Sequence, residues 1–133
     1  MHAQCNARLF SMKELNFQPL GIGIVISGKK GYLTIGKDVV KKLNMPTHAS
    51  ILINKSKTAI AVIPCHEREI LSFKVPDGLM DDHHKSFTIY SKEFVEDVLQ
   101  TNSLDKNKTY HIAGTFDEKF EIAVFPITEM VED

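Results

Sequence analysis

The stretch that decides the fold runs from residue 33 to residue 64, with Leu-Thr-Ile at 33–35, Lys-Asp-Val-Val at 37–40 and Ile-Ala-Val-Ile-Pro at 60–64. The same three segments return in the same order as Phe-Thr-Ile at 87–89, Lys-Glu-Phe-Val at 92–95 and Ile-Ala-Val-Phe-Pro at 122–126. A unit of this length buries too little apolar surface to be stable alone. The sequence therefore predicts two copies of one small unit that share a core.

The periodicity within each copy predicts β-strands around one short helix. Ile22, Ile24 and Ile26 alternate with other residues, as in a strand with one buried face. The tight turn Gly28–Gly31 would join this strand to the next. In the first copy we expect strands at 22–26, 32–35, 50–54 and 59–64 and a helix at 37–43. In the second copy we expect strands near 70–75 and at 87–90, 110–115 and 119–126, with a helix from Ser91, its expected N-cap, to about residue 100.

The fold class that follows is mainly β with short helices, formed by two β-β-α-β-β-like repeats in one pseudo-symmetric barrel. We expect an N-terminal lead-in at 1–19, a first, basic repeat at 20–68 and a second, acidic and diverged repeat at 69–133. After the helices, Asn102-Ser103-Leu104 parallels Asn44-Met45-Pro46.

The two halves of the chain carry opposite charge. Residues 1–74 contain 11 Lys and Arg against 4 Asp and Glu, whereas residues 75–133 contain 5 against 13, within a total of 16 and 17. One half can therefore attract an anionic polymer while the other cannot. The same asymmetry is also typical of two halves that attract each other.

The sequence has no apolar run long enough to span a membrane. Its first residues lack the pattern of a signal peptide, so we expect a cytoplasmic protein without a membrane partner. With Cys5 and Cys65 as the two cysteines, free thiols are expected rather than a disulfide framework.

The first copy resembles the AbrB/SpoVT family of swapped-hairpin DNA-binding domains. The resemblance rests on Gly31 before the return strand, the alternation through Leu33 and Ile35, the short helix ending at Leu43, and the apolar Met45 after it. It covers residues 20–64 well and 70–126 more loosely. In that family two copies interlock into one closed β-barrel. The tandem form is similar to the MraZ proteins, although their Asp-x-x-x-Arg repeats are missing here.

Members of that family bind DNA through basic side chains of the strand–turn–strand and the adjoining helix. The resemblance implies double-stranded DNA as the partner and a role in transcription regulation, with contacts from Lys29, Lys30, Lys37, Lys41 and Lys42. Lysine cannot make the bidentate guanine contact of arginine, so phosphate contacts are expected. A homodimer would supply a symmetric footprint. Such lysines are equally typical of an ordinary solvated face.

The second copy suggests an alternative, non-enzymatic function in protein interaction or inhibition. Its acidic surface would dock on a basic partner protein through Glu93, Glu96, Asp97, Asp117 and Glu118.

Chemical sites are not expected. The pairs Cys65-His66 and His83-His84 lack metal-ligand spacing, and no serine or cysteine has the setting of a nucleophile. The glycines at 28 and 31 do not form a phosphate-binding loop. The sequence therefore predicts a protein that is not an enzyme and needs no cofactor or metal.

Overall fold

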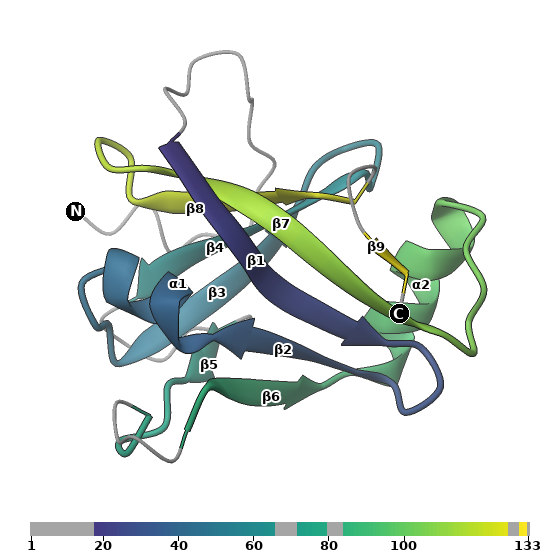
Figure 1. Ribbon diagram of the computed structural model, residues 1–133, viewed down its shortest axis with the longest axis horizontal. Coiled ribbons are helices and arrows are strands. Elements are labelled where there is room, and N and C mark those ends of the chain that lie inside the picture. The colour runs from purple at the N-terminus through teal and green to yellow at the C-terminus, as the bar shows by residue number, and fades with distance from the viewer. Residues whose placement is uncertain (1–17, 66–71, 80–83, 128–130, 133) are drawn as a thin grey trace.

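Eight antiparallel strands of the computed structural model curl into a nearly closed barrel, with two short helices towards opposite ends (Figure 1). The structure describes residues 18–65, 72–79, 84–127 and 131–132. The helices are α1 (Lys37–Lys42) and α2 (Lys92–Thr101). The strands are β1 (Gln18–Ser27), β2 (Tyr32–Gly36), β3 (His48–Ile53), β4 (Ala59–Cys65), β5 (Ser72–Lys74), β6 (Ser86–Tyr90), β7 (Thr109–Asp117), β8 (Ile122–Pro126) and β9 (Val131–Glu132).

The strand order in the sheet is β5-β3-β4-β8-β7-β1-β2-β6, and β9 pairs separately with β7. Hydrogen-bonded pairing is not found between β5 and β6, the two strands at the ends of this order, within the described part of the chain. The barrel is therefore open along one seam. The predicted mainly β class with short helices is confirmed.

The two helices are held against the barrel by their apolar faces. Val39 and Val40 of α1 and Val95, Val98 and Leu99 of α2 all lie in the main core. A helix of six residues such as α1 is not stable by itself in water, whereas burial of each aliphatic side chain contributes about 1.5–3 kcal/mol. Packing on the core therefore fixes the orientation of α1, and with it the direction of its polar face.

Phe125 of β8 packs directly on the backbones of two neighbouring strands. A Cβ atom added to Gly114 of β7 would lie 2.4 Å from the Phe125 ring, and one added to Gly23 of β1 would lie 2.7 Å from it. Both distances are shorter than any normal carbon–carbon contact. Glycine at these two positions therefore makes the space that the ring fills.

Three local predictions need correction. Ile22 does not share the buried face of Ile24, because the pairing of β1 with β7 shifts register between them and leaves Ile22 59% exposed. Strand β1 already begins at Gln18, inside the expected lead-in. Ser91 does precede α2, but its side chain makes no capping hydrogen bond. The predicted boundary at 68/69 and the first seventeen residues lie outside the described residues.

The turn between β1 and β2 depends on Gly31. Its backbone has a φ of +71°, a conformation that is costly for any residue with a Cβ atom. Such an atom would also lie 3.0 Å from the Cβ atom of Lys92. Gly21 has a similar φ of +79°, but a Cβ atom there would meet nothing within 4 Å.

We expect Gly31→Ala to lower the free energy of unfolding by about 2 kcal/mol, and Gly21→Ala by about 1 kcal/mol. In both variants an alanine must adopt a positive φ, which destabilises the fold. Only Gly31→Ala also displaces Lys92. Urea denaturation measures both values. Equal losses in the two variants would show that the contact between the turn and α2 does not constrain this part of the fold.

Candidate nucleic-acid interface

Strands β2 and β6 form a two-stranded ribbon with one buried and one outward face. Thr34 lies opposite Thr88 at its centre, and Tyr32 lies opposite Tyr90 near one end. The alternate residues point into the core, as expected for a period of two: Leu33, Ile35, Phe87 and Ile89. The outward face of this pair, which we call the ribbon face, consists of Tyr32, Thr34, Thr88 and Tyr90.

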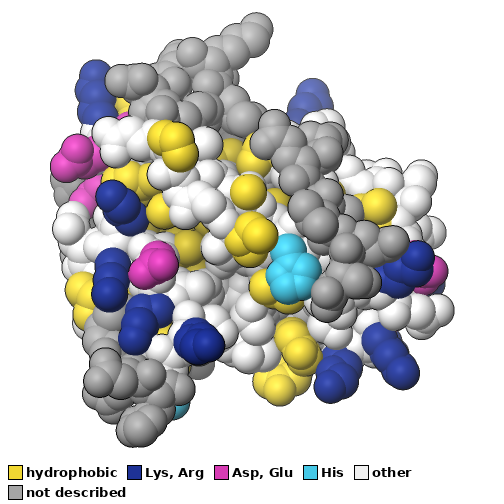
Figure 2. All heavy atoms as spheres, in the orientation of Figure 1, with side chains coloured by type: hydrophobic (Ala, Val, Ile, Leu, Met, Phe, Trp, Pro, Cys, Tyr) yellow, Lys and Arg dark blue, Asp and Glu magenta, His cyan; other side chains and the backbone are white. Residues whose placement is uncertain are grey.

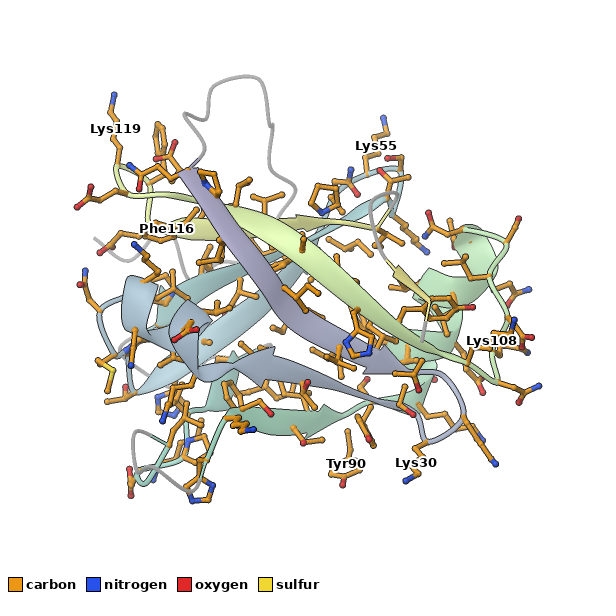
Figure 3. The ribbon with its side chains drawn as sticks, viewed as in Figure 1. Lys30, Lys55, Tyr90, Lys108, Phe116 and Lys119 are labelled. Atoms are coloured by element: carbon orange, nitrogen blue, oxygen red, sulfur yellow. The ribbon has the colours of Figure 1, made fainter. Side chains whose placement is uncertain are left out.

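One end of the ribbon carries the β1–β2 turn with Lys29 and Lys30, both exposed. Tyr32 and Tyr90 meet there edge to face, with ring centroids 5.5 Å apart. The Tyr90 side chain is 76% exposed, and in Figure 3 it points in the same direction as Lys30. We call Lys29 and Lys30 the turn-end lysines. This end combines two cations with an exposed aromatic pair.

The other end of the ribbon leads into α1. The backbone N–H of Lys37 donates to the carbonyl of Lys85, 2.8 Å away, so α1 begins beside the start of β6. Lys41 and Lys42 lie on the exposed side of α1, together with Asp38. We call Lys37, Lys41 and Lys42 the helix-end lysines. Figure 2 shows dark blue side chains gathered over α1 and again at the opposite end of the ribbon, with hydrophobic side chains between them.

The five lysines predicted from the sequence therefore form two groups rather than one patch. The five residues of β2 separate the groups, a span of about 16 Å at ~3.3 Å per residue. Two ion pairs occur among the described residues, Lys57–Asp97 and Lys74–Asp77, and neither involves Lys29, Lys30, Lys41 or Lys42. None of these four cations forms an ion pair with a described residue, although Asp38 lies on the same side of α1 as Lys41 and Lys42.

The predicted acidic residues do not lie on one surface either. Glu93, Glu96 and Asp97 are on α2, where the Asp97 carboxylate lies 2.8 Å from Lys57 Nζ. Asp117 is 1% exposed, and its Oδ1 accepts a hydrogen bond from the backbone N–H of Phe120. Asp117 therefore shapes the β7–β8 turn and is not available to a docking partner. Glu118 is exposed in that turn, at the other end of the barrel from α2.

Sequence reasoning missed several residues of this interface. Tyr32 and Tyr90 lie opposite each other on the outward face of the two strands, and Lys85 and Lys92 flank β6. The period-two alternation around Thr88 could have identified Tyr90 as an outward residue. Nothing in the sequence alone indicated that β6 pairs with β2, and only that pairing brings the tyrosines together.

The candidate metal ligands do not form a cluster among the described residues. Cys65 is buried, and its Sγ lies 3.1 Å from Ser50 Oγ. His84 is exposed, whereas Cys5, His66 and His83 lie outside the described residues.

In the part of the chain that the structure describes, neither α1 nor α2 has the length and apolar character needed to cross a bilayer. Comparisons with protein-family models, with curated proteins and with solved structures find no match to this chain.

Proposed function

We propose that this protein binds double-stranded DNA through the ribbon face, with a lysine group at each end on the phosphate backbone, and that it regulates transcription. The observation that carries the proposal is the arrangement of the cations around β2 and β6. Lys29, Lys30, Lys41 and Lys42 are exposed and outside the ion pairs found in the described residues. Uncompensated lysines at a surface are the groups that displace counterions from a duplex.

The span of the ribbon supports a groove-binding geometry. The major groove of B-DNA is about 12 Å wide and admits a two-stranded β-ribbon. Lysines about 16 Å apart along β2, on flexible side chains, can reach the phosphates on both sides of one groove. The ribbon face between them offers the hydroxyl groups of Thr34, Thr88 and the two tyrosines. Hydroxyls can donate to or accept from base edges, whereas the lysines contribute affinity without sequence information.

An AbrB-like origin of the barrel from two equivalent units is also part of this proposal, and the hydrogen bonds around the ribbon support it. The N–H of Lys37 donates to the carbonyl of Lys85, and the N–H of Ser91 donates to the carbonyl of Gly31. Rotation by 180° about an axis through the Thr34–Thr88 pair superimposes each of these two hydrogen bonds on the other. In this arrangement α1 follows β2, α2 follows β6, and the two helices begin at opposite ends of the ribbon.

The helix ends support the same equivalence. The N–H of Met45 donates to the carbonyl of Val40, 3.0 Å away, and the N–H of Leu104 donates to the carbonyl of Leu99, 2.8 Å away. These two hydrogen bonds make Met45 the structural equivalent of Leu104. The alignment expected from the sequence, Asn44-Met45-Pro46 with Asn102-Ser103-Leu104, paired Met45 with Ser103 and is therefore shifted by one residue. Both helices therefore end in the same geometry although their connections differ.

The acidic second repeat is less suited to be the binding surface. Asp97 is already paired with Lys57, Asp117 is buried, and Glu118 is far from α2. Of the five acidic residues, Glu93 and Glu96 are left as a pair on one element. Two carboxylates on one helix make a weak electrostatic surface in water.

We expect the purified chain to bind a fluorescently labelled duplex, with an affinity that falls at least tenfold between about 50 mM and 200 mM salt. The reason is that each phosphate neutralised by a lysine releases a counterion. Fluorescence anisotropy measures the affinity at each salt concentration. Absence of binding at the lowest salt, where phosphate contacts are strongest, would contradict the proposal.

A further inference from the structure

One edge of β6 carries backbone hydrogen-bonding groups that find no partner among the described residues. The carbonyl of Lys85 accepts from the N–H of Lys37, just after β2, and the N–H of Ser91 donates to the carbonyl of Gly31, just before β2. The backbone groups of the odd-numbered residues between Lys85 and Ser91 therefore face β2 in the alternating antiparallel pattern. The backbone groups of Ser86, Thr88 and Tyr90 therefore point away from β2. Among the described residues, no strand pairs with that edge and no backbone hydrogen bond outside the β2–β6 pair involves these three residues.

The edge is open because the preceding chain leaves the sheet. The N–H of Val75 still donates to the carbonyl of Thr47, so the chain follows β3 up to this residue. Pro76 has no N–H to continue such pairing, and the N–H of Leu79 then closes a turn onto the Pro76 carbonyl. No described segment between β5 and β6 covers the seam as a strand.

Core side chains along this seam are slightly exposed, as Leu52 and Ile122 are elsewhere in the barrel. Phe87 and Ile89 of β6 are 6% and 5% exposed, and Val75 is 8% exposed. Ile24 and Ile112, deep in the rest of the barrel, are at 0%. A strand added at the β6 edge would complete the hydrogen bonding and cover these side chains.

The composition of β6 offers no protection against such pairing. Its five residues are Ser-Phe-Thr-Ile-Tyr, with no charge and no proline, although exposed edge strands usually carry one or the other. Its pattern of polar residues outward and apolar residues inward is also that of β2, Tyr-Leu-Thr-Ile-Gly, with which it already pairs. A strand of the same pattern fits the free edge in the same way.

We propose that the β6 edge is where a second copy of this chain docks, by antiparallel pairing of the two β6 strands about Thr88. Charge favours this occupant. Exposed Lys85 precedes β6 and exposed Glu93 follows it. In the antiparallel pair, Lys85 lies opposite Ser91 of the second copy, two residues before that copy's Glu93. Two such contacts form, related by the two-fold axis.

Lys92, the other cation near this end, does not oppose the pairing. It packs on the β1–β2 turn, since an atom added to Gly31 would lie 3.0–3.2 Å from the Cα, Cβ and Cγ atoms of Lys92. Its stem is therefore directed towards the turn and not towards the β6 edge. The dimer requires nothing from the proposed DNA binding, and the two can fail separately. Because β6 already pairs with β2, the dimer contains a four-stranded sheet that is wider than the two-stranded ribbon a major groove admits, so we expect the dimer and the groove-bound chain to exclude each other.

Sedimentation velocity on the full chain tests the proposal. We expect twice the chain mass at micromolar concentrations, and a dimer dissociation constant raised at least about tenfold in Thr88→Lys, where two like charges face each other. Thr34→Lys is the matched control, because Thr34 lies on the same outward face but on β2. A monomeric wild type, or equal weakening by the two variants, would overturn the proposal.

Two further experiments, a charge exchange and a disulfide cross-link, show whether the second copy docks at this edge. Glu93→Lys should weaken the dimer, and combining it with Lys85→Glu should restore it, because the contact is re-formed with exchanged charges. Thr88→Cys, oxidised with diamide, should form an intermolecular disulfide, since facing residues of a hydrogen-bonded pair have Cα atoms about 5.5 Å apart. Thr34→Cys should not. Failure of the exchange to restore the dimer, or equal cross-linking of both cysteines, would place the second copy elsewhere.

Discussion

Gly114→Ala is expected to lower the free energy of unfolding by about 3 kcal/mol, a large effect for a single methyl group. The added Cβ atom would lie 2.4 Å from the Phe125 ring and 2.6 Å from the backbone oxygen of Val124. The ring is fully buried and cannot move away, and the oxygen belongs to the neighbouring strand. The strands β7 and β8 must therefore separate, in the middle of the sheet.

Thermal unfolding measures this loss, which corresponds to a fall of about 10 °C in Tm for a domain of this size. Gly36→Ala is the matched control, because its nearest contact would be 3.5 Å from the Gly23 oxygen, and it should change stability by less than about 0.5 kcal/mol. Phe125→Leu should partly relieve Gly114→Ala, so the double variant should lose less than the sum of the two single losses. Full additivity would show that the ring and the glycine backbone are not in close contact.

Reversing the charge of four lysines at the two ends of the ribbon should abolish duplex binding. The variant combines Lys29→Glu, Lys30→Glu, Lys41→Glu and Lys42→Glu, and we expect at least a thousandfold loss of affinity at low salt. Four phosphate contacts are lost, and four carboxylates are placed against the backbone instead. All four side chains are exposed, so the melting temperature should change little.

A variant of equal net charge separates local contacts from the overall field. Lys55 and Lys119 are exposed lysines in turns away from the ribbon, and Figure 3 shows both at the opposite side of the barrel from Lys30 and Tyr90. Their reversal to glutamate gives a double variant with the same net charge as Lys29→Glu with Lys30→Glu, or as Lys41→Glu with Lys42→Glu. It should retain most of the affinity. If this double variant and the two ribbon-end double variants lose binding equally, anisotropy will have measured a response to net charge alone, and the ribbon is not the interface.

Much of the architecture could be predicted from the sequence, because each element has a local signal. The alternation of apolar residues indicated the strands, and Gly31 indicated a turn that requires a positive φ. The apolar spacing of Val39, Val40 and Leu43 placed the lysines of α1 on its polar face, where they are found.

What the sequence could not show depends on pairing between distant segments. The exposure of Ile22 follows from a register shift against β7, and the open seam follows from the departure of the chain at Pro76. The burial of Asp117 follows from the closure of its turn by the N–H of Phe120. Acidic residues in turns are usually solvated, so its sequence setting indicated an exposed carboxylate.

The division of the lysines into two groups could not be predicted from the sequence either. Lys30 and Lys37 are close in sequence, yet strand β2 between them carries them to opposite ends of the ribbon. The sequence indicated which residues are cationic, and their separation became clear only from the strand between them. The five lysines named from the sequence thus form two groups about 16 Å apart.

The salt dependence of duplex binding by two partly neutralised variants tests the central proposal most directly. We expect Lys29→Gln with Lys30→Gln, and separately Lys41→Gln with Lys42→Gln, each to make the slope of log affinity against log salt shallower by about 2, since every phosphate contact contributes about 0.9. Such a result would place both ends of the ribbon on the backbone at once. An unchanged slope in either variant would contradict a duplex held across β2 and β6.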